Sequence, residues 1–153
     1  MILDQTYKIE IPTYPLCVVI SFTQKKQLFK QEIKTALGLK NTKVLSGFNT
    51  HFNNPDFKNH GRTARLSSGN IVVSLTSIDH GIIAHELLHA TTLLLDAVGV
   101  VFSIDSNEVY AYLMQYLTSI VYKILEENEG VFSTEQRHQG IGPSDIQDKT
   151  EAA

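Results

Sequence analysis

The stretch Ile82-Ile83-Ala84-His85-Glu86-Leu87-Leu88-His89 decides how this chain is interpreted. On a helix, His85 and His89 lie one turn apart on the same face. Two imidazoles at this spacing can bind one zinc ion through ring nitrogens at about 2.0–2.1 Å. Glu86 lies beside them and can accept a proton from a metal-bound water without being a ligand itself. The stretch therefore predicts a helix that carries a metal site.

The residues around this motif predict where the helix lies. Apolar side chains precede, interrupt and follow the histidines, so the helix is apolar nearly all round and we expect it to be buried. Buried His and Glu side chains are costly unless something satisfies them, and a metal ion does so directly. The competing interpretation is a pair of buried histidines hydrogen-bonded to carbonyls or tyrosines. That interpretation leaves Glu86 and the later acid Glu108 unexplained.

The motif and the later pair Asn107-Glu108 together resemble the HExxH zinc metallopeptidases. Within them the resemblance is to the gluzincins, whose third ligand is a Glu on a following helix, and it covers roughly residues 71–126. It implies that His85, His89 and Glu108 bind zinc and that Glu86 is the catalytic base. The chain departs from thermolysin-like members at Tyr112, where they carry an acid that supports a ligand His.

The run from Glu108 to Tyr112, Glu-Val-Tyr-Ala-Tyr, is also similar to the second helix of small phage-encoded HExxH proteins. This similarity implies a source in a phage, and with it a place in the host cytoplasm or in the virus particle.

Two other acids compete with Glu108 for the role of third ligand. Asp96 follows His89 by seven residues, a rise of about 10 Å on a helix, which is too far for one ion unless the helix breaks first. We expect the helix to continue to Gly99. Asp105 fits better as an N-cap or first-turn residue of the next helix. A short turn over 99–104 would fold that helix back and bring Glu108 toward the histidines.

The composition predicts one globular domain. The chain has 153 residues, of which 42% are hydrophobic and 19% charged, and its net charge is -3. We assign residues 1–129 to a single zincin-like domain and residues 130–153 to a polar tail, because the apolar pattern stops there. The Lys and Arg residues form no basic stripe, so nucleic acid is not an expected partner. The single cysteine, Cys17, excludes a disulfide framework.

No targeting segment or membrane span is expected. The N-terminus lacks a basic region followed by an apolar one, so an export signal is not predicted. The longest apolar stretch, residues 81–102, is interrupted by His85, Glu86, His89 and Asp96, which a bilayer would not tolerate unpaired. We therefore expect a soluble cytoplasmic protein with no membrane partner.

The apolar pattern predicts strands and helices in the order of an α+β fold. The resemblance implies a small twisted β-sheet that packs on the HExxH active-site helix and on a following Glu-bearing helix. This arrangement is zincin-like by resemblance. The expected strands are residues 7–11, 16–22, 44–48 and a hairpin of 62–66 with 70–75. The expected helices are residues 23–37, a helix that starts at about 77 or 79 and runs to 98, and residues 105–128. Residues 51–61 are expected to form a loop.

One strand of this sheet is a candidate for substrate binding. In zincin folds, the strand before the active-site helix, or its neighbour, lies at the edge of the cleft. There it binds an extended peptide by strand addition. The candidate residues here are Val72, Val73 and Ser74. The alternative is an ordinary interior strand.

Three residues are candidates for stabilising a developing oxyanion or for supporting the ligands. Tyr112 and Tyr116 follow Glu108 at four and eight residues, roughly on its face of the helix, and can donate phenolic hydrogen bonds. His80 precedes the motif. For the tyrosines, a place in the core with the hydroxyl satisfied nearby is the competing interpretation.

The leading functional hypothesis is a zinc-dependent peptidase that hydrolyses a peptide or protein substrate through a metal-activated water. A second hypothesis is a catalytically idle zincin-fold protein in a larger assembly such as a virus particle, with a partner that holds the tail. A third is a zinc hydrolase that acts on another bond, because the motif specifies activated water and not the substrate.

Overall fold

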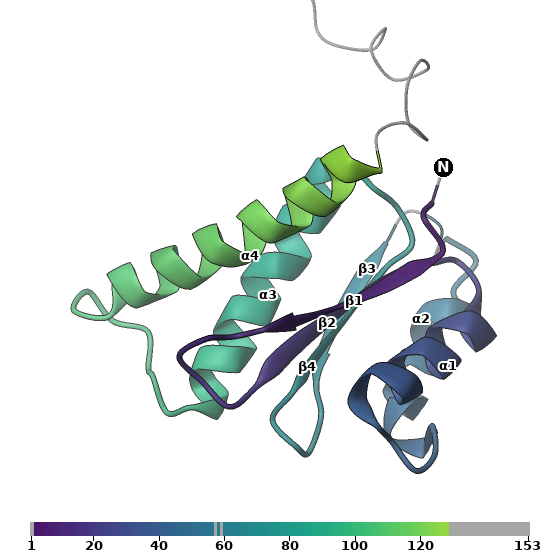
Figure 1. The fold of residues 1–153 in the computed structure, drawn as a ribbon, viewed down its shortest axis with the longest axis horizontal. Coiled ribbons are helices and arrows are strands. Elements are labelled where there is room, and N and C mark those ends of the chain that lie inside the picture. The colour runs from purple at the N-terminus through teal and green to yellow at the C-terminus, as the bar shows by residue number, and fades with distance from the viewer. Residues whose placement is uncertain (1, 57, 59, 129–153) are drawn as a thin grey trace, which may run out of the picture.

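The computed structural model describes residues 2–56, 58 and 60–128, and over these residues the chain forms an α+β fold (Figure 1). A mixed four-stranded sheet has the order β1-β2-β4-β3. Its strands are β1 (Gln5–Glu10), β2 (Cys17–Phe22), β3 (Gly61–Arg65) and β4 (Ile71–Leu75). The pair of β2 with β4 is parallel, and the two outer pairs are antiparallel. The prediction of an α+β fold is confirmed, and the tail over residues 130–153 lies outside the described residues.

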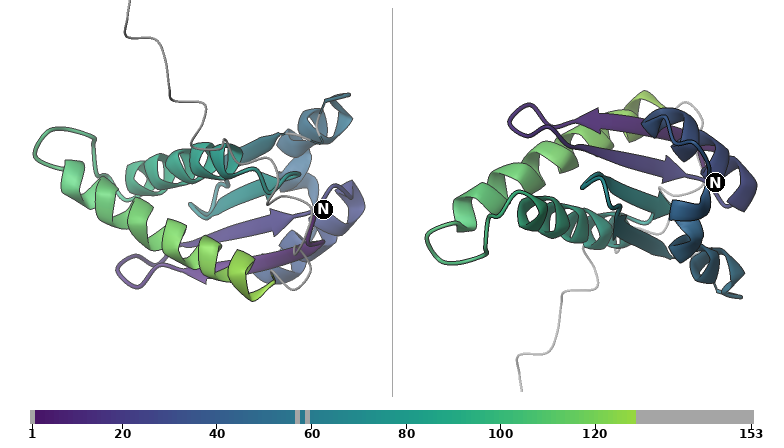
Figure 2. Two further views of the ribbon diagram at one scale, coloured as in Figure 1. Left: turned by 90° about the horizontal axis from the view of Figure 1, so that it is seen from above. Right: turned by 90° about the horizontal axis from the view of Figure 1, so that it is seen from below.

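Helices cover both faces of the sheet. One face carries α1 (Lys26–Leu37), the 3-10 helix η1 (Lys43–Phe48) and α2 (Asn49–Asn53); the other carries α3 (His80–Ala97) and α4 (Asn107–Glu127). In Figure 2, α3 lies along the β3 and β4 half of the sheet and α4 along the β1 half. Every residue of β2 and β4 is buried, as expected for central strands covered on both faces.

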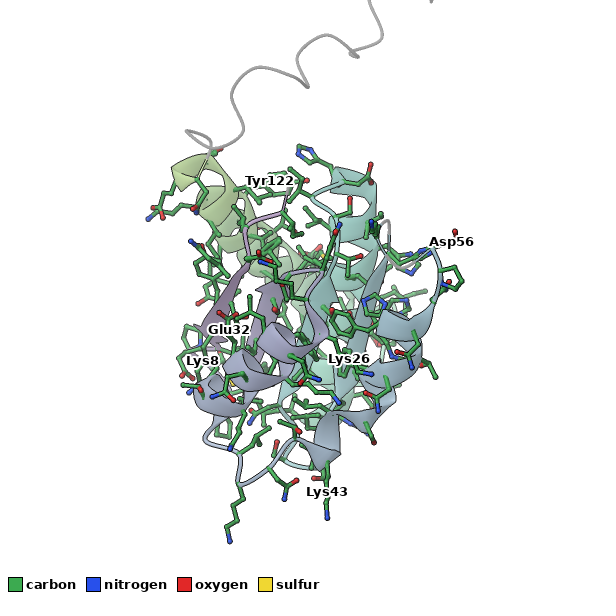
Figure 3. The ribbon with its side chains drawn as sticks, turned by 90° about the vertical axis from the view of Figure 1, so that its right-hand side faces the viewer. Lys8, Lys26, Glu32, Lys43, Asp56 and Tyr122 are labelled. Carbon is green, nitrogen blue, oxygen red and sulfur yellow. The ribbon has the colours of Figure 1, made fainter. Side chains whose placement is uncertain are left out.

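The side chains of β2 alternate between two apolar cores. Val18 and Ile20 pack in the core under α3 and α4, whereas Cys17 and Val19 pack in the core under α1 and α2. Figure 3 looks at the molecule from the side of α1, where Lys26 and Lys43 lie at the surface. Glu32 of the same layer turns to the sheet and accepts a hydrogen bond from the Thr6 hydroxyl.

Both ends of α3 are set by local residues. Asp79 is the N-cap, and its Oδ1 accepts a hydrogen bond from the Ile82 amide at 3.0 Å. The helix stops before Gly99, which has φ +81°, and the Val100 amide then bonds to the Leu95 carbonyl at 2.9 Å. The helix therefore continues past His89 without a break.

Two predictions about the N-terminal half were wrong. Residues 44–48 form a 3-10 helix instead of a strand, because Leu45 and Phe48 are buried three residues apart whereas Val44 is 50% exposed. The expected loop over 51–61 includes the end of α2 and the first residue of β3. The hairpin of β3 with β4 is confirmed, with Gly69 at φ +91° in its turn.

Within the described residues, no helix is both long and apolar enough to cross a bilayer.

His51 of α2 is a buried titratable group in the second core. Its ring is 8% exposed, its Nε2 lies 3.3 Å from the Ser74 hydroxyl, and it packs against Phe52. Burial, together with the positive charges of Arg62 and His60, lowers the pKa of His51 from 6.5 to about 4. The folded protein therefore holds this imidazole neutral over a pH range in which the unfolded chain protonates it.

We predict that the free energy of unfolding falls as the pH is lowered from about 6.5 to about 4. In that window His51 is protonated in the unfolded chain but not in the folded protein. The free energy of unfolding therefore falls by about 3 kcal/mol over the whole window. His51→Gln removes the titration and keeps a side chain that can bond to Ser74, so its stability should depend less on pH. Urea denaturation at pH 7, 5.5 and 4 measures the difference, with His80→Gln, at an exposed position, as the control. Parallel pH profiles for the wild type and His51→Gln would contradict this assignment.

Candidate functional site

His85 and His89 lie together on an exposed face of α3. Their Nε2 atoms are 3.0 Å apart, and their ring centroids are 4.7 Å apart with planes at 76°. Both residues are exposed, and Leu88 between them is 56% exposed. The expectation that α3 is buried all round was wrong, because one face of the helix packs on the sheet and on α4 while the histidine face remains open to solvent.

The histidine face borders the outer edge of β3. Asp96 lies on this face, seven residues after His89, which is two helical turns. Its Oδ2 accepts a hydrogen bond from Nη1 of Arg65, at the end of β3, at 2.6 Å. Because α3 continues unbroken from His89 to Ala97, Asp96 is a rim residue and not a third ligand. The two histidines and the edge strand therefore line the same side of the molecule.

Glu86 points away from solvent and toward β3. Its side chain is 5% exposed. The Thr63 hydroxyl lies 2.5 Å from Glu86 Oε2, to which it donates, and 3.2 Å from the Glu86 carbonyl oxygen. A buried carboxylate without a hydrogen bond would be costly, so this contact offsets part of the desolvation of Glu86.

The strand β3 approaches the Glu86 side chain of α3 closely at Gly61. A Cβ atom on Gly61 would lie 2.2 Å from Glu86 Cγ, 2.7 Å from Cδ and 2.8 Å from Oε1. Any side chain here would collide with the carboxylate, so the position needs glycine for close approach and not for an unusual backbone angle. Gly61 thus gives the Glu86 carboxylate the space that it occupies.

A hollow of about 380 Å³ connects the histidine motif with the start of the edge strand. It is lined by His60, Gly61, Asp79, Gly81, Ile82, His85 and Glu86. The hollow thus brings one metal-binding candidate and the base candidate to a common space, although Asp79 is already engaged as the cap of α3.

The structure does not bring Glu108 to the histidines. The helices α3 and α4 are antiparallel, because His80 contacts Tyr122 and Thr91 contacts Met114. Glu108 precedes Met114 by six residues, and His89 precedes Thr91 by two. Along the helix axes Glu108 and His89 are therefore about 12 Å apart, in opposite directions from the Thr91 contact. Glu108 is also exposed.

The connection between the two helices explains this displacement. In Figure 1 the first turns of α4 project at the left of the molecule, and only later turns cross α3. The Ser106 hydroxyl bonds to the Val101 carbonyl at 2.6 Å, and the Tyr110 hydroxyl bonds to the Val100 carbonyl at 3.0 Å. These bonds hold the start of α4 at the end of α3, whereas the histidines lie near the middle of α3.

Over the part of the chain that the structure describes, which includes all three predicted ligands, no three His, Cys, Asp or Glu side chains gather closely enough to hold a metal ion. His85 and His89 by themselves fit a shared ion, because bonds of about 2.0–2.1 Å from each nitrogen span the 3.0 Å between them. The same separation also fits a direct hydrogen bond in which one ring donates to the other. The full three-ligand set is not assembled.

The predicted supporting residues lie elsewhere. The Tyr116 hydroxyl donates to the carbonyl of Glu10 at 3.0 Å, at the end of β1 and so at the opposite edge of the sheet from β3. Tyr112 is 68% exposed and lines a groove along α4 together with Tyr116. His80 stacks edge-on against Tyr122 at 5.1 Å. None of the three lines the hollow beside His85 and Glu86.

The predicted substrate strand is an interior strand. Val72, Val73 and Ser74 lie in β4, which pairs on both sides and is fully buried. Its neighbour β3 is the edge strand beside α3. Among the described residues, β3 pairs only with β4, so the strand edge adjacent to the motif belongs to the other strand of the hairpin.

Sequence reasoning missed Gly61 and Thr63. Gly61 was expected at the end of the loop over 51–61, where a glycine is ordinary, so nothing in the sequence indicated that it allows a helix to approach closely. Nothing in the pattern around Thr63 distinguishes it from an ordinary strand residue.

Comparisons with protein-family models, curated proteins and solved structures found no match for this chain. The functional argument therefore rests on the geometry of α3 and β3.

We predict that Gly61→Ala lowers the free energy of unfolding by about 1–3 kcal/mol, because the new Cβ must displace the Glu86 side chain or separate β3 from α3. Urea denaturation measures the loss. Gly47→Ala is the matched control, because a Cβ on Gly47 meets nothing within 4 Å and its backbone angle is ordinary. Equal stability of the two variants would show that β3 and α3 are not in close contact at Gly61.

Proposed function

We propose that this chain is a zinc-dependent peptidase of the HExxH type. In this proposal His85 and His89 bind the ion, Glu86 is the catalytic base, and the outer edge of β3 binds the backbone of an extended substrate. The observation that carries it is the meeting of the Nε2 atoms at 3.0 Å on an exposed helix face, beside the carboxylate that follows His85 in the sequence.

The position of Glu86 supports the role of a base. Its carboxylate is buried at the wall of the hollow that His85 also lines, so it is shielded from bulk water but can reach a group bound there. When bound, zinc lowers the pKa of a coordinated water to about 7 and polarises a carbonyl group. Glu86 takes the proton of the attacking water and delivers it to the leaving amine.

The position of β3 supports a peptide as substrate. Within residues 2–56, 58 and 60–128, β3 pairs with β4 alone, so its outer edge offers unpaired backbone groups. Such an edge binds an extended chain by strand addition. The sheet above α3, with an antiparallel edge strand beside the histidines, also supports the zincin-like comparison made from the motif.

A catalytically idle zincin-fold protein in a larger assembly is the second candidate. The observation that favours it is the displacement of Glu108, which leaves two histidines where three protein ligands are usual for catalytic zinc. The two proposals differ in their expected metal affinity and turnover.

We predict that wild-type protein binds zinc and that His85→Ala and His89→Ala each lower the affinity by more than about 100-fold, since loss of a direct ligand exceeds the roughly 10–100-fold effect of an outer partner. Glu108→Ala should leave the affinity unchanged, like the control His80→Ala. Isothermal titration calorimetry measures all four variants. Absence of zinc binding by the wild type would favour the idle protein, and a large loss in Glu108→Ala would contradict the arrangement of α3 and α4.

We predict that Glu86→Gln keeps the zinc affinity and lowers kcat about 100- to 10,000-fold, because the amide cannot accept the proton from water. A peptide-library cleavage assay, scored by mass spectrometry, identifies a substrate, and kcat is then measured on it. Glu126→Gln, at an exposed position on α4, is the control for the substitution. Wild-type turnover in Glu86→Gln would remove Glu86 from the mechanism.

A further inference from the structure

The edge strand β3 fixes the orientation of the Glu86 carboxylate. The Thr63 hydroxyl donates a hydrogen bond to Oε2, and it also contacts the Glu86 carbonyl oxygen on the helix backbone. Gly61 lies beside Oε1, which would be 2.8 Å from a Cβ at that position. The two carboxylate oxygens therefore have different surroundings. Oε2 accepts a hydrogen bond from Thr63, and Oε1 lies near Gly61, which lines the hollow.

Successive side chains of β3 point to opposite faces of the sheet. Thr63 and Arg65 turn toward α3, where they contact Glu86 and Asp96, whereas Arg62 turns to the opposite face and lies over the Phe48 ring at 6.0 Å. The backbone edge of the strand is engaged by neither set of side chains. A substrate paired to that edge would leave the Thr63 hydroxyl in place.

We propose that Thr63 is a positioning residue for Glu86. Its hydroxyl holds Oε2 against β3 and so presents Oε1 to the hollow, where the attacking water is deprotonated. This inference rests on the proposed function, because a base needs orientation only if proton transfer takes place there. Thr63 does not touch the substrate, so its loss should affect turnover and not substrate affinity.

The test compares Thr63→Val, which is nearly isosteric and lacks the hydroxyl, with Thr63→Ser, which keeps it. Thr91→Val is the matched control, because Thr91 is a buried threonine of α3 whose hydroxyl bonds to the Leu87 carbonyl at 2.8 Å, away from β3. In Thr63→Val we expect kcat to fall roughly 10- to 100-fold, the size that corresponds to one hydrogen bond to a charged group. KM and zinc affinity should stay unchanged, and Thr63→Ser should restore kcat.

A second measurement is independent of activity. In protein labelled with carbon-13 at glutamate Cδ, the Glu86 resonance is identified by its absence in Glu86→Gln. We expect it to shift in Thr63→Val, to return in Thr63→Ser and to stay in place in Thr91→Val.

The outcomes separate the two proposals. Active wild-type protein with an unchanged kcat in Thr63→Val would overturn the role of Thr63 and leave the peptidase standing. An unshifted Glu86 resonance in Thr63→Val would overturn the contact itself. Wild-type protein without peptidase activity would overturn the proposed function, and a shifted resonance would then assign the Thr63 contact to folding alone.

Discussion

The packing of Glu86 between α3 and β3 is the interaction on which the candidate site depends. A carboxylate that is 5% exposed would be costly without a partner, and Thr63 supplies one from the edge strand. Gly61, which has no side chain, leaves room for the Glu86 side chain beside the strand. This contact acts together with the buried apolar residues of α3, which pack in the core between the helix and the sheet. Once Glu86 faces β3, the helical period places His85 and His89 on the open side of the helix, along the strand edge.

A helix in which ten of the eighteen residues are apolar therefore carries the candidate site on an exposed face. The apolar residues of α3 pack against two neighbours, the sheet and α4. Because both contacts need apolar side chains, the sequence pattern of α3 does not reveal that one face of the helix is exposed. Leu88 lies exposed between the two histidines as a result. The candidate site at the boundary of α3 and the edge strand β3 has the strand on one side and solvent on the other.

The prediction from sequence succeeded where local chemistry is sufficient. The bounds of α3 follow from Asp79 and Gly99, and the hairpin of β3 and β4 follows from its turn glycine. The prediction of a strand at 44–48 was wrong because a short apolar run does not show whether its hydrophobic residues repeat as in a strand or as in a helix. In the structure, Leu45 and Phe48 reach the core from a 3-10 helix. The choice of β4 as the substrate strand failed because the order of strands in a sheet depends on pairing between distant segments.

By itself, the sequence determined the relation between His85, Glu86 and His89, since the helical period fixes the spacing of residues that are four apart or fewer. Only the tertiary structure decided the positions of Glu108, Thr63 and Gly61 relative to that motif. Their positions depend on the loop that sets where α4 begins, on the register of two antiparallel helices and on which strand lies outermost. Each of these is an interaction between residues far apart in the chain, and no local pattern encodes it.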